Sequence, residues 1–384
     1  MTEASSLDGI RVLDLTRLLP GPFASMVLSD LGAQVDKVED PRGGDYLRVT
    51  PPLAGDGMSH LHHWLNRGKR SVELDLKTPA GVETLKRMVP HYDVLLEGNR
   101  PGVMDRLGLG YETLRALHPG LIYCALTGYG QDGPLANRAG HDLNYLARCG
   151  ALGLIGPEDQ TPALPGVQIA DVGGGLYAVI GVLAALAARA RSGEGRLVDV
   201  SLSESALTFG TFGFASRIGG FSPPRGADML MGGIAPYGTY LTSDGGAVSL
   251  GSLEPKFWKA FCEGVGIEPD NLALFPGKHQ SEWKERLRGI FASRTRAEWA
   301  ELAERLDCCL EVVVEPADAL EDPHLRARGV WSTVQTDDGG TVTMGKTPVA
   351  PAATGRAPRQ GEHTSDILRE AGLSDDEITA LRGR

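Results

Sequence analysis

The chain has 384 residues, of which 42% are hydrophobic and 23% charged, as expected for a soluble globular enzyme with a sizeable core. Its formal net charge of −11 argues against nucleic acid and anionic membranes as general partners. The five cysteines have no CxxC spacing, and the chain does not open with a basic segment followed by an apolar one. We therefore expect a cytoplasmic protein without a disulfide framework or a cysteine-based metal knot.

The first half of the chain alternates between strand-like and helix-like segments. Ile10–Leu15 has the composition of a buried strand, Pro20-Gly21-Pro22 interrupts it, and 23–31 has helical spacing. Gly32 ends that helix and Ala33–Val38 is again strand-like, which completes a βαβ unit. Repeated alternation of this kind predicts an α/β fold with a parallel, Rossmann-like sheet. The expected strands are 10–15, 33–38, 71–76, 93–96, 121–126 and 197–202, and the expected helices are 23–31, 78–89 and 172–191.

The second half has a different character. Glycine and proline become frequent between 214 and 233, and periodicity is lost, which predicts a domain boundary. We expect a large domain over 1–213, a smaller α/β domain over 226–329, and a C-terminal part over 330–384 that returns to the large domain. The expected strands here are 237–241, 248–250, 331–335 and 341–344, and the expected helices start near 255, 282 and 296 and cover 364–371 and 374–381.

Three further patterns have ordinary structural interpretations. The apolar run 176–188 is shorter than the about 20 residues that span a bilayer, so it predicts a buried helix. The adjacent Cys308 and Cys309 are expected inside a helix. The three histidines within 60–63 cannot all point one way on a helix or strand, so we expect a packed or solvated loop and no metal site.

Gly128-Tyr-Gly130-Gln-Asp-Gly133 matches GxGxxG literally and follows an expected strand. The dinucleotide fingerprint requires a helix that opens inside the motif to receive the pyrophosphate, but Pro134 follows the third glycine here. We therefore interpret this stretch as a tight active-site loop, and we expect no nucleotide cofactor.

Basic residues stand near several expected strand ends. Residues 66–70 form a short basic run before one strand, and Lys77 follows it. Arg100 follows the next strand, and Arg106 lies in the helix after it. Ligands of doubly wound sheets bind outside the carboxyl ends of the strands, so these cations predict a phosphate-bearing ligand. For each of them, solvated surface charge is the competing explanation.

The most informative residues are His141, in Gly140-His141-Asp142, and Asp171, expected just before a helix that opens with three glycines. Taken singly, His141 is compatible with a packed histidine and Asp171 with a helix N-cap. Glycines at a helix start weaken the helix by about 1 kcal/mol each, which favours close approach of another group to the backbone. An imidazole and a carboxylate beside helix-start amides could move a proton while an oxyanion develops.

These stretches resemble the class III CoA-transferase superfamily, and within it the α-methylacyl-CoA racemase branch. The resemblance covers nearly the whole chain. It includes Leu7–Leu15, Leu28–Ala33, Leu65–Ser71, Leu74–Lys77, Glu97–Gly102, Gly128–Pro134, Gly140–Asp142, Asp171–Gly175 and Gly361–Ser365. The residue matching His141 is usually aromatic in the transferases and is histidine in the racemases, so the branch assignment depends mainly on His141.

The resemblance implies a set of site residues. His141 and Asp171 would be the two proton carriers, and Glu254 would orient the imidazole. Asp40 occupies the position of a CoA-binding arginine of the racemases, and Arg42 is its nearest replacement. The residues matching the CoA site are Arg42, Leu74, Leu76, Lys77, Gly98, Asn99, Arg100, Arg106 and Tyr145.

The leading functional expectation is a racemase that interconverts (R)- and (S)-2-methylacyl-CoA by 1,1-proton transfer through an enolate. It needs no cofactor, because CoA is part of the acyl-CoA substrate. The alternative is a CoA-transferase in which Asp171 is the nucleophile, and a third possibility is a non-catalytic protein that binds CoA thioesters. Family members form interlocked homodimers, and the resemblance implies the same assembly here.

Overall fold

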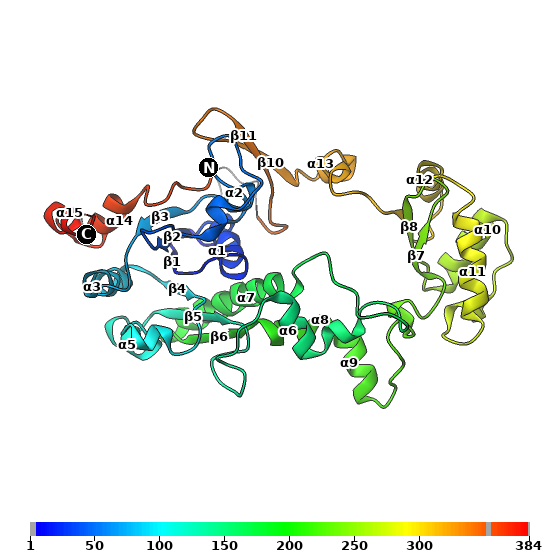
Figure 1. The fold of residues 1–384 in the computed structure, drawn as a ribbon, viewed down its shortest axis with the longest axis horizontal. Coiled ribbons are helices and arrows are strands. Elements are labelled where there is room, and N and C mark those ends of the chain that lie inside the picture. Colours follow the sequence, from blue (N-terminus) through cyan, green and yellow to red (C-terminus); the bar gives the residue numbers. More distant parts are fainter. Residues whose placement is uncertain (1–4, 351–354, 383–384) are drawn as a thin grey trace. The chain divides into compact units, whose positions relative to one another are not determined.

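The computed structural model describes residues 5–350 and 355–382 (Figure 1). Contacts divide the chain into two compact units. Unit 1 comprises Met1–Cys149, Val167–Thr208 and Asp322–Arg384, and unit 2 comprises Gly150–Gly166 and Phe209–Glu321. The glycine- and proline-rich stretch 214–233 therefore starts inside unit 2, and residues 150–166, assigned above to the large domain, also belong to unit 2.

Unit 1 is built on a six-stranded sheet with the strand order β3-β2-β1-β4-β5-β6. All neighbouring strands are parallel, so the predicted Rossmann-like α/β fold is confirmed. The strand order reverses between β1 and β4, which is the point where such sheets bind ligands. The strands are β1 (Arg11–Asp14), β2 (Gln34–Glu39), β3 (Arg70–Glu73), β4 (Val94–Glu97), β5 (Ile122–Thr127) and β6 (Leu197–Ser201).

Helices cover both faces of this sheet, which is why β4 and β5 are buried along their whole length. On one face, α1 (Pro20–Asp30) packs against α7 (Ile169–Ser192) (Figure 1). On the other face, α3 (Pro79–Met88) and α5 (Tyr111–Leu117) share a core with the last two helices of the chain.

The C-terminal part packs on unit 1 through these two helices, α14 (Thr364–Glu370) and α15 (Asp375–Arg382). Backbone N–H of Glu73 donates to Oγ1 of Thr364 over 3.1 Å. Unit 1 also contains α2 (His60–Asn66), α4 (Val103–Arg106), α6 (Asp142–Cys149), α13 (Pro323–Ala327), and the antiparallel pair β10 (Trp331–Gln335) and β11 (Thr341–Gly345). Helix α8 (Leu202–Phe209) ends at the first residue of the second segment of unit 2, and α9 (Thr211–Ile218) belongs to unit 2.

Helix α7 is long and apolar enough to cross a membrane by length and composition. In unit 1 it instead contacts α1, β5 and β6, and residues such as Ala178 and Val182 are fully buried there. The buried helix predicted at 176–188 is thus part of α7, with one face on the sheet.

Unit 2 has a three-stranded antiparallel sheet, β7 (Tyr237–Leu241), β8 (Ala247–Gly251) and β9 (Leu310–Val312). It packs with α10 (Pro255–Val265), α11 (Gln280–Phe291) and α12 (Arg296–Arg305) around a core rich in aromatic side chains. The prediction that Cys308 and Cys309 lie inside a helix is wrong. They lie between α12 and β9, where Cys309 has a left-handed φ of 56°.

Candidate active site

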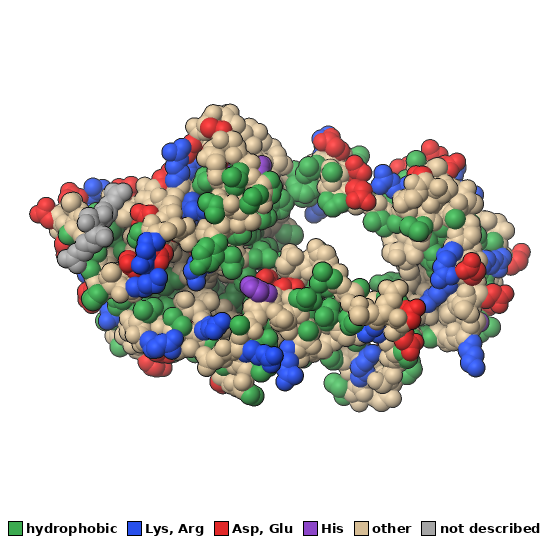
Figure 2. All heavy atoms as spheres, viewed as in Figure 1, with side chains coloured by type: hydrophobic (Ala, Val, Ile, Leu, Met, Phe, Trp, Pro, Cys, Tyr) green, Lys and Arg blue, Asp and Glu red, His purple; other side chains and the backbone are tan. Residues whose placement is uncertain are grey.

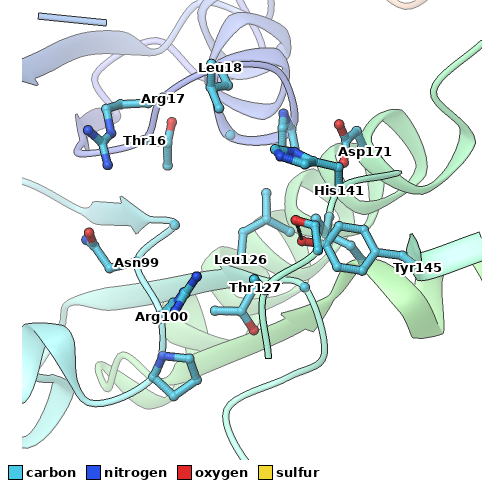
Figure 3. A pocket seen from close by; sticks show the side chains of 18 of the residues that line it. Thr16, Arg17, Leu18, Asn99, Arg100, Leu126, Thr127, His141, Tyr145 and Asp171 are labelled. Atoms are coloured by element: carbon cyan, nitrogen blue, oxygen red, sulfur yellow. Dashed lines mark hydrogen bonds between the residues drawn. The ribbon is translucent and has the colours of Figure 1, made fainter. Parts of the chain in front are cut away.

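A pocket of about 470 Å³ opens at the carboxyl ends of β1, β4, β5 and β6 (Figure 3). It therefore lies at the point where the strand order of the sheet reverses. All of its lining residues belong to unit 1. They include Thr16, Arg17, Leu18, Gly98, Asn99, Arg100, Thr127, Gly128, Arg138, His141, Asn144, Tyr145 and Asp171.

His141 and Asp171 lie near each other at one side of this pocket, although they come from different elements (Figure 3). His141 is exposed, whereas Asp171 is half-buried. Burial, followed by the charge of Asp142, raises the pKa of Asp171 to about 6, and His141 acts in the opposite direction. A carboxyl group with such a pKa can hold or release a proton near neutral pH, as a general acid or base must.

Asp142 connects the two residues structurally. Its Oδ1 accepts hydrogen bonds from backbone N–H of Ala170 at 2.7 Å and of Asp171 at 3.0 Å, so it caps the start of α7. Backbone N–H of His141 in turn donates to Oδ1 of Asn144 over 3.0 Å. The cap fixes the loop that carries His141 against the helix that carries Asp171.

This arrangement corrects the expected position of Asp171. The helix begins at Ile169, so Asp171 lies within its first turn and not before it. The helix-start amides of Ala170 and Asp171 are occupied by Asp142, and that of Val172 by the carbonyl of Gln168. These amides are therefore not the free oxyanion donors that the sequence suggested.

Gly174 and Gly175 of α7 allow close packing between helices. A Cβ on Gly175 would lie 2.8 Å from both Cδ1 of Phe23 and the carbonyl oxygen of Pro20, and a Cβ on Gly174 would overlap the side chain of Leu202. The group that approaches this backbone closely is thus α1 and the start of α8. The prediction of close approach holds, but protein and not ligand occupies the space.

The GxGxxG stretch forms a loop after β5, and no helix opens within residues 128–133. Gly130 and Gly133 adopt left-handed φ values of 88° and 83°. A Cβ on Gly128 would lie 2.5 Å from the ring of Tyr145. The Tyr145 hydroxyl donates to the carbonyl of Gly140 over 2.6 Å, and burial raises its pKa to about 12, so it remains protonated. The loop thus seats Tyr145 against the wall of the pocket.

The expected CoA residues fall around two adjoining hollows. Gly98, Asn99, Arg100 and Tyr145 line the pocket already described. A second hollow of about 340 Å³ lies at the carboxyl ends of β1 to β4 and is lined by Leu74, Leu76, Lys77 and Asn99.

Arg42 and Arg106 line neither of these hollows. The guanidinium of Arg42 forms ion pairs of 2.9 Å with both Asp40 and Asp75, and these two carboxylates do line the second hollow. Arg42 would have to leave them to hold a phosphate. Arg106 is exposed at the end of α4.

Glu254 is in unit 2, where it is exposed and precedes Pro255 at the start of α10. Its partnership with His141 stays a prediction. The histidines of 60–63 lie in α2, where His62 and His63 are buried and have Asn66 and Asp56 as partners. In residues 5–350 and 355–382, no group of three or more His, Cys, Asp or Glu side chains could hold a metal ion.

Among the residues of the pocket region that were not singled out from the sequence, four contribute charge or position the loop of His141. Arg17 and Arg138 line the pocket without an ion-pair partner in the described part of the chain, and Asn144 and Asp142 position the loop of His141. Asp142 could have been found, because it adjoins His141 and is a favoured capping residue. The other three carry no signal beyond their residue type.

The pocket therefore combines an imidazole and a carboxylate with several cations. Asp171 is the one carboxylate among the described residues that line it, whereas Arg17, Arg100 and Arg138 contribute positive charge. Such a site can attract a polyanionic ligand and move a proton within it.

Comparison with known proteins identifies the family of the chain. The model of CoA-transferase family III matches residues 7–364. The chain belongs to CoA-transferase family III. It is 39% identical to α-methylacyl-CoA racemase from Mus musculus, over 98% of this chain and 96% of the relative. It is 34% identical to succinate–glutarate CoA-transferase from Agrobacterium fabrum, over 95% of both chains.

A solved structure of a CAIB/BAIF family protein from Brucella suis is also similar, with a TM-score of 0.83 and 32% identity over 96% of this chain and 100% of that chain. The relatives of this chain thus include proteins named as racemases and proteins named as transferases. The chain is an enzyme of this racemase and CoA-transferase type.

Proposed function

We propose that this enzyme racemises 2-methylacyl-CoA thioesters by 1,1-proton transfer. The observation that carries the proposal is the meeting of His141 and Asp171, two different proton carriers, in one pocket at the carboxyl ends of the sheet. The 39% sequence identity with a racemase from Mus musculus, over 98% of this chain, supports it.

In the proposed reaction, neutral His141 removes the proton from C2 and the electron pair moves into the thioester carbonyl to give an enolate. Protonated Asp171 then delivers its proton to the opposite face of C2, which inverts the configuration. In the reverse direction the ionised carboxylate of Asp171 is the base and the imidazolium of His141 is the acid. The raised pKa of Asp171 makes both protonation states accessible near neutral pH.

The CoA moiety would lie along the two adjoining hollows, and no further cofactor is needed because CoA is part of the substrate.

We also propose a cytoplasmic homodimer. Leu176, Tyr177 and Ile180 of α7 are exposed by 41%, 39% and 57% in the single chain, and a second chain could cover them. Figure 2 shows hydrophobic side chains reaching the viewed surface in patches between charged ones. Light scattering coupled to size exclusion would test the dimer.

The test of the reaction is proton NMR of 2-methylbutyryl-CoA with the enzyme in D₂O and no acyl acceptor. Loss of the C2 proton signal with loss of optical purity is expected. CoA transfer to an added free acid without exchange would instead support the alternative, in which ionised Asp171 attacks the acyl carbonyl. That alternative rests on the transferase relatives and on the place of Asp171 in the pocket. Tight binding with neither reaction would indicate a non-catalytic role.

A further inference from the structure

The loop after β1 has a backbone conformation that needs an explanation. Leu18 adopts a left-handed φ of 65°, which crowds the Cβ of any residue but glycine. The side chain of Leu18 is exposed by 40%, so burial of the leucine does not hold it there. Non-glycine residues in such conformations persist where the surroundings fix them, and they gather at functional sites.

A buried carboxylate fixes the distal side of this loop. Backbone N–H of Leu18 donates to Oδ1 and Oδ2 of Asp45 over 3.2 and 3.3 Å. Asp45 is also paired with Nζ of Lys37 at 3.1 Å, and both side chains are fully buried. The same carboxylate accepts from backbone N–H of Leu47 at 3.1 Å, so it caps the short 3₁₀ helix Tyr46–Val49.

A second buried cluster fixes the proximal side. Nζ of Lys37 donates to the carbonyl of Thr16 over 2.7 Å, and backbone N–H of Thr16 donates to Oδ1 of Asp14 over 2.9 Å. Burial would raise the pKa of Asp14, but Lys69 and Lys37 outweigh it and lower that pKa to about 2. Thr16 and Leu18 are thus both held by buried charges, and Arg17 lies between them.

Arg17 itself is exposed. It lines the pocket of His141 and Asp171 (Figure 3). It also lines the second hollow at the carboxyl ends of β1 to β4. Its Nη1 donates to the Tyr46 hydroxyl over 3.3 Å, and its guanidinium lies 5.3 Å from the Tyr46 ring centroid. Among residues 5–350 and 355–382 it has no carboxylate partner, whereas Lys77 of the second hollow has Asp40 at 3.5 Å.

We propose that Arg17 binds the diphosphate of the CoA moiety at the junction of the two hollows. The inference rests on the proposed function only in taking a CoA thioester as the ligand. The diphosphate is the anionic segment between the adenosine and pantetheine parts of CoA, and Arg17 is the cation shared by both hollows. A guanidinium can bind phosphate oxygens through two parallel N–H donors, which requires the fixed position that Asp45 and Lys37 give to this loop.

The test compares Arg17→Ala with the matched surface variant Arg115→Ala on α5. Steady-state α-proton exchange is measured with 2-methylbutyryl thioesters of CoA, 3′-dephospho-CoA and pantetheine. Arg17→Ala should raise KM about 10- to 100-fold for the first two thioesters and leave kcat and the pantetheine thioester unchanged. Arg115→Ala should change none of these values.

Two outcomes would overturn the proposal. An effect that disappears with the dephospho-CoA thioester would place Arg17 on the 3′-phosphate, and an effect that persists with the pantetheine thioester would mean general damage to the pocket. Calorimetric binding of free CoA and free dephospho-CoA to the same variants gives the answer even if the wild type exchanges no proton. Failure of the proposed reaction and failure of this inference are therefore distinguishable.

A double-mutant cycle tests the role of the loop. Leu18→Gly removes the steric restriction on φ and should loosen Arg17, so KM for the CoA thioester should rise several-fold in the wild-type background. If Leu18 positions Arg17, the same change should raise KM by a smaller factor in the Arg17→Ala background than in the wild type. Additive effects of the two substitutions would refute this positioning role.

Discussion

The half-buried carboxylate of Asp171 should make the wild-type enzyme less stable above about pH 6 than an Asp171→Asn variant. Burial, followed by the charge of Asp142, raises its pKa from 3.8 to about 6. Between these values the folded state binds a proton that the unfolded chain releases. The stability of the wild type therefore falls as pH rises from about 4 to about 6, and it stays lower above that range. Asparagine removes this dependence.

The size of the effect follows from the shift. A rise from 3.8 to about 6 corresponds to about 3 kcal/mol when the carboxylate is fully ionised, which is an upper bound because Asp171 is half-buried. The buried amide of asparagine offsets part of it, so we expect a gain of about 1–2 kcal/mol at pH 8. The amide term does not depend on pH, whereas the ionisation term is smaller by about 1.4 kcal/mol at pH 5, so the gain there should be close to zero.

The assay is urea unfolding followed by alkylation of Cys124 and mass spectrometry. Cys124 is fully buried on β5, so its labelling reports the unfolding of unit 1 and not of unit 2. Asp132→Asn, at an exposed position of the same unit, is the control and should leave the midpoint unchanged. A variant that is no more stable at pH 8, or equally stabilised at both pH values, would refute the reasoning. Asp171→Asn should also lose racemisation, because asparagine cannot carry the proton.

Three other substitutions test the site and its supports. His141→Ala should reduce α-proton exchange in D₂O by about 10²–10⁴-fold with little change in stability, because His141 is exposed; full retention would exclude it as the base. Asp142→Ala should destabilise unit 1 by about 1 kcal/mol through loss of the α7 cap, and should also move the Asp171 limb of the pH–rate profile to lower pH. A limb that stays in place would show that Asp142 has no influence on Asp171. Gly174→Ala should destabilise unit 1 by about 1–3 kcal/mol in urea unfolding, since its Cβ would overlap Leu202. An unchanged urea midpoint would mean that α7 and α8 can move apart at no cost in stability.

The same pKa shift separates the two candidate reactions. In a transferase, Asp171 must be ionised to attack, so kcat/KM should rise through pH 6. In a racemase, one direction needs ionised Asp171 and the other needs it protonated, so the profiles of the two enantiomers should have opposite limbs near that pH. Profiles with the same limb for both enantiomers would contradict the racemase mechanism.

The periodicity of the chain determined much of the fold. The apolar run 121–126 overlaps β5, because a strand buried on both faces needs nearly continuous apolar sequence. Strand β1 lies inside the predicted strand Ile10–Leu15. The alternation of strands and helices predicted the parallel sheet, and the sheet places the ends of its strands around one pocket. His141 and Asp171 were found from residue type, neighbouring glycines and resemblance.

Contacts between distant segments decided the rest. The sequence could not show that Asp142 caps α7, that Gly174 and Gly175 face protein and not ligand, or that Cys308 follows the end of a helix. Arg17 gave no signal either, since its position depends on buried charges at 14, 37 and 45. Local pattern reports which residues prefer a strand, a helix or burial. The pKa of a carboxylate and the direction of a guanidinium depend on neighbours that only the folded chain brings together.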